Sequence, residues 1–512
     1  MAVKIIILVV FFAVMILVGV SAKKKVHGVD DFVLGGRKVG PWMAAFSFGT
    51  SYFSAVIFVG YAGQFGWKFG VASTWIGIGN ALVGSMLAWV ILGRRTRVMT
   101  NHLSSSTMPD FFGKRYDSKA LKIAASAIAF VFLIPYTASV YNGLSKLFAL
   151  AFDIPYAAVV IGMAVLTGVY VILGGYMASS MNDFIQGMIM LIGIIAVIAS
   201  VLAGQGGFTE ALKALSNVQT AETLEQPGVF ASFFGPDPAG LLSVVILTSL
   251  GTWGLPQMVQ KFYAIKDEKA IKTGTIVSTF FAIIIGGGSY FMGGFGRLFG
   301  GEGASFINAE TGAVAYDGIV PAMLQNSLSD ILIGVVVVLV LSASMSTLSA
   351  LVLTSSSTLT LDLLKDNIIK KMDQKKQILI MRIMIVFFVA VSVIIALDPP
   401  TAIAQLMGIS WGALAGAFLA PFLYGLYWKK VTRPAVWVSF LSGMGITVAS
   451  LFIDSLSPIV AGALAMIAGL IIVPIVSIVT KNSQKDKNRI DNIFECYNVN
   501  ITVKKSRQLS SD

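Results

Sequence analysis

Apolar residues along the chain cluster into thirteen runs of roughly 20 residues, with short polar stretches between them. A helix of about 20 apolar residues crosses the roughly 30 Å hydrocarbon core of a bilayer, so each run predicts one membrane span. The pattern therefore predicts an all-α polytopic membrane protein with thirteen transmembrane helices. The predicted spans are residues 3–21, 41–63, 71–93, 120–150, 156–174, 182–204, 238–263, 272–298, 329–361, 378–397, 401–426, 434–452 and 458–480.

The first apolar run, Ile5 to Val20, has a single lysine before it and the lysines 23–25 after it. A secretory signal peptide carries its positive charge in front and ends at a small-residue cleavage site. The run therefore predicts a retained span and not a removed peptide.

Lysine and arginine residues gather in alternate loops between the predicted spans. Cation-rich loops lie on the cytoplasmic side of membrane proteins, so the alternation predicts an outside N-terminus and a cytoplasmic C-terminus. The opposite loops hold little more than Lys68 and Lys213, and the loop near 175–181 holds no cation. The cation-rich segments are 23–38, 94–119, 266–269, 365–376, 429–433 and the tail from residue 481, which is expected to be mobile or to lie on the anionic inner leaflet.

Composition agrees with a membrane protein and excludes several other classes. Hydrophobic residues make up 56% of the 512 residues and charged residues 12%, with a mean hydropathy of +0.83; soluble proteins carry about twice this share of charge. The net charge of +12 lies in alternate loops, so we expect no nucleic-acid partner. One cysteine, Cys496, and two histidines are too few for a Cys/His metal site. No GxxxxGK[ST] loop is present to hold ATP phosphates, so we expect a gradient-driven transporter and not an enzyme.

One predicted span contains a face that could bind a bare cation. In the run 341–353, LSASMSTLSALVL, Ala343, Ser346 and Thr347 stand at i, i+3 and i+4, so they share one side of a helix. The alternative is ordinary packing, because Ser and Thr also bond to the carbonyl one turn earlier or let helices approach closely.

Two spans carry residues that interrupt a helix. The second span has Gly49 within a cluster of hydroxyls, and the seventh has Gly251, Gly254 and Pro256 close together. Unwound backbone at membrane depth survives where it lines a cavity or is buried in protein. The breaks lie five spans apart, which predicts two repeats, spans 2–6 and 7–11, around a midplane site; two unrelated kinks are the alternative.

The chain resembles the sodium:solute symporter family, which includes sodium/proline, pantothenate, monocarboxylate, sialic acid and sodium/glucose carriers. The resemblance rests on the runs DDFVLGGRKVGPW, FGTSYFSA, LGGYMASSMNDFIQ and SASMSTLSALVLTSSS, in this order along the chain. It implies a LeuT-type five-plus-five inverted repeat with one helix before it and two after. The implied domains are 1–40 for the first helix and a cytoplasmic loop, 41–204 for the first repeat, 205–237 for an extracellular loop, 238–426 for the second repeat, 427–480 for two C-terminal helices, and 481–512 for a cytoplasmic basic tail.

The resemblance also implies a sodium site. Its ligands fall on the carbonyls of Thr50, Phe53 and Ala343 and on the hydroxyls of Ser346 and Thr347. Five neutral oxygens suit a hard monovalent ion.

Asp183 is the clear carboxylate of the sixth span, and an ionisable group inside the membrane is a functional candidate by default. Some relatives use the matching aspartate for a second sodium, together with hydroxyls that fall here on Ser346, Ser349 and Ala350. Because Ala350 has no hydroxyl, the alternatives for Asp183 are to guide ions from the cytoplasm or to pair with a neighbour.

The solute is the least determined part of the prediction. Where sodium/proline carriers have Asp, Trp and Tyr, this chain has Tyr52, Thr248 and Thr252, and the arginine that holds a carboxylate in sialic acid carriers is missing from the fourth span. We expect an amino acid such as proline, or a short organic acid such as pantothenate or a monocarboxylate. The expected contacts are Ser51, Ser54, Asn80, Tyr136 and Trp253.

The predicted function is sodium-coupled secondary active symport by alternating access, in the plasma membrane. The expected partners are a small-molecule solute, Na⁺ and the lipid bilayer, with no obligatory protein partner. A passive channel and a sodium-dependent substrate sensor on the same helical scaffold are the alternatives.

Overall fold

The computed structural model describes residues 2–23, 26–152, 154–220, 223–301, 303–365, 368–369 and 372–497, and its secondary structure is almost entirely helical. The predicted all-α fold class is confirmed, while residues 498–512 of the predicted tail lie outside the described part. The helices are α1 (Ala2–Lys23), α2 (Val29–Leu34), α3 (Pro41–Tyr52), α4 (Ala62–Phe69), α5 (Thr74–Gly79), α6 (Arg94–His102), α7 (Met108–Tyr116), α8 (Lys119–Phe152), α9 (Tyr156–Gly204), α10 (Phe208–Ser216), α11 (Pro238–Gly254), α12 (Pro256–Tyr263), α13 (Glu268–Ala282), α14 (Gly288–Gly293), α15 (Ile319–Ser327), α16 (Asp330–Thr358), α18 (Gln374–Leu397), α19 (Ile403–Tyr427), α20 (Arg433–Ala449), α21 (Pro458–Val479) and α22 (Gln484–Phe494).

Eight helices of the described chain are long and apolar enough to cross a membrane, or nine if the bent pair α11 and α12 is one span. Two of the eight exceed a single crossing: the stretch Val56–His102 has 47 residues, and α9 has 49. At 1.5 Å per residue a straight helix of this length would reach about 70 Å, more than twice the bilayer core.

Glycines with left-handed backbone divide both long stretches. Gly70 has φ +61° at the end of α4, and α9 is two helices that meet at Gly175, with φ +55°. A Cβ at these positions would lie 2.0 Å from the Phe230 carbonyl oxygen and 2.7 Å from that of Phe32. Only glycine tolerates both the backbone angle and the close approach, so these residues fix where each stretch turns.

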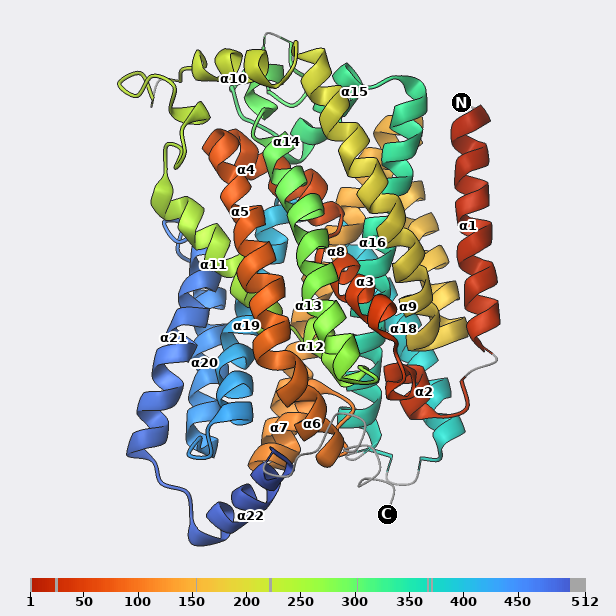
Figure 1. The fold of residues 1–512 in the computed structure, drawn as a ribbon, viewed down its shortest axis with the longest axis vertical. Helices are drawn as coiled ribbons and strands as arrows, with labels where there is room; N and C mark the ends of the chain where they lie inside the picture. Colours follow the sequence, from red (N-terminus) through yellow and green to blue (C-terminus); the bar gives the residue numbers. More distant parts are fainter. Residues whose placement is uncertain are drawn as a thin grey trace.

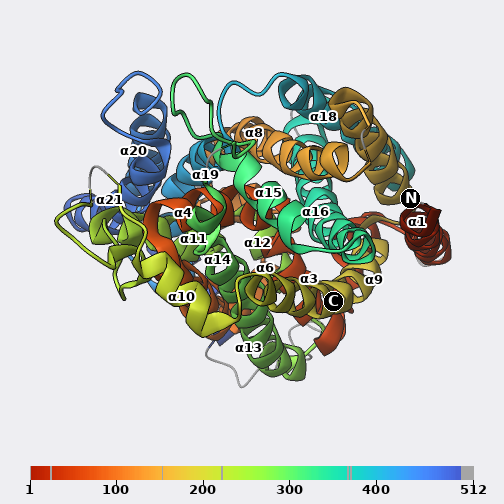
Figure 2. The same cartoon turned by 90° about the horizontal axis from the view of Figure 1, so that it is seen from above.

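The helices that carry the candidate site lie inside the bundle. Figure 2 shows α3, α12 and α16 within a ring of helices, with α1 at one rim and α20 and α21 at the opposite rim. Helix α16 contacts α3, α8 and α9, and α20 and α21 pack on α19. Figure 1 shows α10 and α15 at one end of the molecule and α6, α7 and α22 at the other.

The predicted tail begins with an ordered helix, α22. The Ser483 hydroxyl caps it by accepting a hydrogen bond from the Asp486 N–H at 3.1 Å, and Ile490 and Phe494 are buried. Arg489 donates from Nη1 to the carbonyl of Arg115 at 3.1 Å, which fastens α22 to the end of α7. This part of the tail is therefore held against the protein.

Candidate functional site

The second span is broken after Tyr52. Helix α3 ends there, Phe53 has extended backbone (φ −102°, ψ 112°), and a π-helical segment, Val56–Tyr61, continues the span. The Ser54 hydroxyl accepts a hydrogen bond from the Val56 N–H at 3.2 Å and so caps the second half. The predicted break at Gly49 is wrong in position: Gly49 lies within α3, where a Cβ would be only 2.7 Å from the Phe281 ring of α13.

The seventh span is broken between Gly254 and Pro256. Helix α11 ends at Gly254, Leu255 has extended backbone (φ −78°, ψ 122°), and Pro256 begins α12 at an angle of 46°. Gly251 was predicted as part of the break, but it lies inside α11. A Cβ there would approach the Trp411 ring to 2.5 Å, so the glycine allows close packing against α19.

The end of α3 meets α16 through a cluster of oxygens. Ser346 Oγ lies 2.9 Å from the Thr50 carbonyl oxygen and 3.0 Å from that of Ala343. Thr347 Oγ1 lies 3.3 Å from the Thr50 carbonyl oxygen and 3.4 Å from that of Ser51. The side chains of Thr50, Ser346 and Thr347 are fully buried, so the two helices join through polar atoms in the interior.

The spacing of these oxygens suits a cation of the size of Na⁺ or Ca²⁺. Oxygen ligands at 2.3–2.6 Å from such an ion, at right angles to each other, lie about 3.3–3.7 Å apart. Both distances from Thr347 Oγ1 to the carbonyl oxygens of Thr50 and Ser51 fall in this range. The shorter distance from Ser346 Oγ to the Thr50 carbonyl oxygen is that of a direct hydrogen bond. Within the described residues the hydroxyls contact the carbonyls of Thr50 and Ser51 but not that of Phe53, which was predicted as a ligand. Ser51, predicted as a solute contact, thus also offers its backbone carbonyl to this cluster.

No carboxylate group is needed to complete this cluster. Within the described residues no three His, Cys, Asp or Glu side chains gather in a way that could hold a metal ion. The oxygens around Thr50 and Ser346 are all neutral, which favours a monovalent ion over a divalent one.

A second polar cluster lies one helical turn before the first on α3. The Ser47 hydroxyl donates a short hydrogen bond to Asp183 Oδ2 of α9, and Lys261 Nζ of α12 donates to Ser47 Oγ at 2.8 Å. Lys261 Nζ lies 3.6 Å from Asp183 Oδ2 and 5.2 Å from the centre of the Tyr176 ring. Asp183 is therefore paired with a buried cation, one of the roles that the sequence left open.

Lys261 was missed in the sequence, although a signal was present. It is one lysine in the second half of a broken apolar span, and an intramembrane charge usually has a partner of opposite sign. Ser349, predicted to accompany Asp183, instead shares a hydrogen bond of 2.7 Å with Ser179 Oγ. Asp183 and Ser349, the residues named for a possible second sodium or an ion path, thus have separate partners in the structure.

The expected solute contacts divide into two groups. The Ser51 hydroxyl and the Asn80 amide nitrogen are buried and have no hydrogen-bond partner among the residues that the structure describes. Tyr136 meets the Trp411 ring edge-on at 5.8 Å, and Trp411 stacks on Tyr52 at 6.0 Å. The aromatic pair of Tyr52 and Trp411 was not predicted, because their proximity depends on how α19 packs on α3.

Two expected solute contacts have other roles. Ser54 caps the second half of its span, and Trp253 Nε1 donates to the Val83 carbonyl at 3.0 Å. Conversely, Gln257, in the first turn of α12, was not predicted but is buried, and neither polar atom of its side chain has a hydrogen-bond partner in the described part of the chain. Buried polar atoms usually have partners, so unpaired ones next to a helix break mark a place where an ion, water or solute can bind.

A motif before α3 links the broken spans at one end of the molecule. Arg37, of the GGR run, is buried with φ +53°, and its guanidinium donates to the carbonyls of Tyr263 at 3.3 Å and Ser105 at 2.6 Å. Burial lowers the pKa of Arg37, and the Asp30 carboxylate at 3.8 Å acts against this. Arg37 thereby ties the start of α3 to the end of α12.

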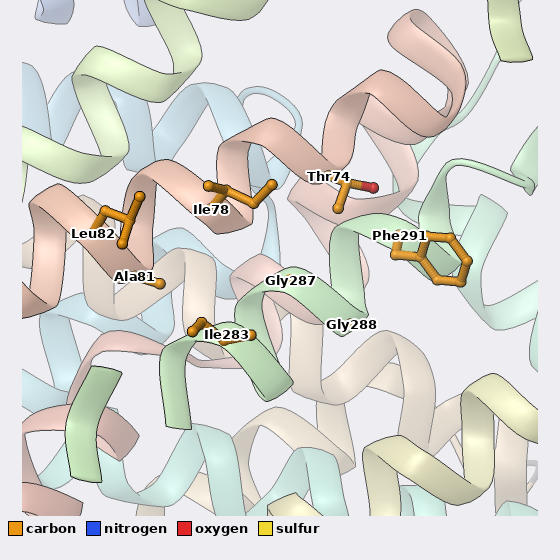
Figure 3. A pocket seen from close by; sticks show the side chains of 8 residues that line it. All are labelled: Thr74, Ile78, Ala81, Leu82, Ile283, Gly287, Gly288 and Phe291. Atoms are coloured by element: carbon orange, nitrogen blue, oxygen red, sulfur yellow. The ribbon is translucent and has the colours of Figure 1, made fainter. Parts of the chain in front are cut away.

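An apolar cavity of about 370 Å³ lies between α5 with the adjoining segment Asn80–Leu87 and the helices around α14. Figure 3 shows its lining, in which Thr74 is the polar member and Leu82 and Ile283 face each other's helices. Leu82 and Ile283 expose about half of their surface, and none of the predicted site residues lines the cavity. It is a crevice on the outer face of the bundle, apart from the expected solute contacts.

Comparisons with known proteins identify the family. The model of the sodium:solute symporter family matches residues 32–443. The osmoregulated proline transporter OpuE of Bacillus subtilis is 28% identical over 95% of this chain and 96% of its own, and the sodium/proline symporter of Haemophilus influenzae is 29% identical over 84% of each chain.

Solved structures show the same fold. A Na⁺-coupled sialic acid symporter superposes with a TM-score of 0.77 at 17% identity, covering 94% of this chain and 99% of its own. Mhp1, a nucleobase-cation-symport-1 family transporter, superposes with a TM-score of 0.54 at 14% identity, covering 90% and 98%. The protein is an integral membrane protein that belongs to the sodium:solute symporter family, and it is a sodium-coupled solute transporter and not an enzyme.

Proposed function

We propose that this protein imports a small zwitterionic solute, with proline the first candidate, together with Na⁺ bound between α3 and α16. The observation that carries the proposal is the contact of the Ser346 and Thr347 hydroxyls with the carbonyls of Thr50 and Ser51 at the broken end of α3. Filling of this site by Na⁺ would add ligands from both helices and fix their separation.

Sodium would couple to the solute through the break. Ser51 supplies a carbonyl to the oxygen cluster, and its unpaired hydroxyl is available to the solute. Binding of the ion therefore orders the same residue that the solute contacts, which favours the state that can bind solute.

The gradient supplies enough free energy for uptake. Entry of one Na⁺ down a tenfold gradient releases about 1.4 kcal/mol, and a potential of about 100 mV adds about 2.3 kcal/mol. Together these would concentrate a neutral solute several hundred-fold.

A stoichiometry of one Na⁺ per solute follows from the second cluster. The Asp183 carboxylate, which matches an aspartate that some relatives use for another sodium, lies 3.6 Å from the Lys261 ammonium group, which supplies a positive charge in place of an ion. Because both charges are almost fully buried, the pair is neutral without an ion from solution.

Proline is favoured by the relatives, whose names give it as the transported solute, at 27–29% identity. The unpaired Ser51 hydroxyl and Asn80 amide could hold its polar end, and Tyr136 and Trp411 could enclose its ring. Tyr52 and Thr252, which differ from the proline-carrier pattern, donate instead to the carbonyls of Thr248 at 2.7 Å and Gly84 at 2.9 Å. These two side chains stabilise the packing of the seventh span, and the solute then depends on other groups.

The proposed topology has thirteen spans in a LeuT-type five-plus-five repeat, with one helix before and two after. The turns at Gly70 and Gly175 each divide a long stretch into two spans. The cation-rich helices α6, α7 and α22 lie at one end and α10 at the other, which supports an outside N-terminus and a cytoplasmic C-terminus in the plasma membrane.

Uptake by proteoliposomes tests the function. Labelled proline, other neutral amino acids, pantothenate and monocarboxylates are offered with an inward Na⁺ gradient or an equal K⁺ gradient. We expect saturable, Na⁺-dependent accumulation of one solute class above its outside concentration. Equilibration without accumulation would indicate a channel, and saturable binding without uptake would indicate a sensor.

A further inference from the structure

A basic pocket lies where α21 leaves the apolar zone and α22 begins. It has a volume of about 410 Å³ and is lined by the end of α21, the loop between α19 and α20, and one face of α22. Four lysines and one aspartate provide its charge: Lys429, Lys430, Lys481, Lys487 and Asp491.

Most of the positive charge in this pocket has no partner. Lys429 Nζ pairs with Asp491 Oδ1 at 2.7 Å, whereas the ammonium groups of Lys430, Lys481 and Lys487 make no ion pair or hydrogen bond within the described residues. Three uncompensated charges that share one concave surface favour an anionic ligand.

A buried hydroxyl in the same pocket also lacks a partner. Ser477 is 4% exposed, its Oγ makes no hydrogen bond within the described part of the chain, and the residue lines the pocket. Serines in and next to the neighbouring helix α20 bond to a carbonyl three residues earlier, as Ser442 donates to the Ser439 carbonyl and Ser450 to that of Thr447. The free hydroxyl can therefore donate to an oxygen of a bound ligand.

The pocket lies at the height of lipid headgroups. Ile478 lines it and is 68% exposed, and the following Val479 is 76% exposed, as expected of side chains that face acyl chains. Lys481 begins the polar segment two residues later. Figure 1 shows α22 crossing the end of the bundle below α20 and α21, so the apolar wall and the lysines meet at the surface of the membrane.

We propose that this pocket, the α21–α22 pocket, binds the phosphate headgroup of an anionic bilayer lipid. The lysines contact the phosphate, the Ser477 hydroxyl donates to one of its oxygens, and the acyl chains follow Ile478 and Val479 into the bilayer. A bound lipid would stabilise α22, which also contacts α7 through Arg489. The inference does not depend on which solute is transported.

Lipid titration of the purified full-length protein tests the proposal. Phosphatidylglycerol in mixed detergent micelles is titrated while the melting temperature and the lipid retained in native mass spectra are recorded, with phosphatidylcholine and inorganic phosphate as the other ligands. The pocket variant replaces Lys430, Lys481 and Lys487 with Gln, and the control replaces the exposed Lys266, Lys269 and Lys375 with Gln.

We expect phosphatidylglycerol to raise the melting temperature of the wild type and the control, and half-saturation of the pocket variant to need at least tenfold more lipid. The corresponding Lys→Arg variant should bind like the wild type, and Ser477→Ala should bind severalfold more weakly. Equal responses of pocket and control variants would overturn the proposal. So would an equal response to phosphatidylcholine, or saturation by inorganic phosphate alone, which would indicate a site for free phosphate.

Discussion

Replacing Lys261 with Met tests whether the buried ion pair stands in for a second sodium. Asp183 is fully buried and Lys261 is 3% exposed, so neither charge is screened by water in the folded protein. Met has a similar length without the charge and leaves the Asp183 carboxylate with the Ser47 hydroxyl as its hydrogen-bond donor.

The magnitude follows from the cost of an unpaired buried charge. Removal of one partner of a buried ion pair costs about 3–5 kcal/mol, whereas replacement of both by neutral groups is often near neutral. Lys261→Met and Asp183→Asn should each lower the melting temperature by several degrees. The double variant should return close to the wild type, giving a coupling energy of a few kcal/mol.

Sodium should act differently on the single variants. In Lys261→Met the uncompensated negative charge of the buried Asp183 can attract Na⁺ into the space of the lost ammonium group, so Na⁺ should raise the melting temperature more than in the wild type. In Asp183→Asn, Na⁺ should raise the melting temperature no more than it does in the wild type, because no carboxylate is left at this position.

The assay is a thermal melt in detergent, in Na⁺ and in choline at equal ionic strength, followed by Na⁺-dependent uptake. Uptake by the wild type should depend on Na⁺ with a Hill coefficient near one. If Lys261→Met still takes up solute, its uptake should depend on Na⁺ more steeply. If the double variant is as unstable as the sum of the singles, and Na⁺ affects all forms equally, the two residues are not coupled and Lys261 does not replace an ion.

Three further predictions concern other parts of the molecule. Ser346→Ala and Thr347→Ala should each raise the Na⁺ concentration for half-maximal uptake roughly two- to tenfold, because each loses a contact worth about 0.5–1.5 kcal/mol. The control Ser344→Ala should leave this concentration unchanged, because the Ser344 hydroxyl bonds within its own helix. An unchanged Na⁺ requirement in both Ser346→Ala and Thr347→Ala would show that these hydroxyls are not part of the site. Gly66→Ala should prevent stable folding, because the added Cβ would lie 1.9 Å from a backbone carbonyl oxygen of α14. A variant that is monodisperse in size-exclusion chromatography and as stable as the wild type in a thermal melt would contradict this packing. Burial raises the pKa of Cys496 to about 12, so the thiol stays protonated at pH 8 and should react with maleimide far more slowly than an unfolded control; rapid labelling would show that the end of α22 is not docked.

The span pattern was predictable because it depends on local composition. Runs of apolar residues and the alternation of cationic loops need no knowledge of tertiary contacts, and the face of Ser346 and Thr347 follows from helical periodicity alone. The same holds for the break at Pro256, since proline cannot continue a helix.

The errors arose where distant segments meet. Gly49 and Gly251 were predicted as breaks because glycine weakens a helix, but both make room for an aromatic ring of another span, Phe281 and Trp411. The pairing of Lys261 with Asp183 joins residues 78 positions apart, and no local pattern specifies it. A glycine in the sequence can permit either a turn or a close contact between helices. Which of the two it does depends on the segment that packs against it in the fold.

The two polar clusters on α3 differ in charge, and this difference assigns their roles. An ion that must leave in every transport cycle needs a site of moderate strength, which neutral oxygens such as the Thr50 carbonyl and the Ser346 hydroxyl provide. The Asp183 carboxylate would hold a cation more strongly in a buried setting, and it is already paired with Lys261 of α12. The neutral oxygens at the break therefore suit a cation that is released in each cycle, whereas the Asp183–Lys261 ion pair lies one turn away. Separating this pair in every transport cycle would cost several kcal/mol, so we expect α3, α9 and α12 to keep the contact throughout transport.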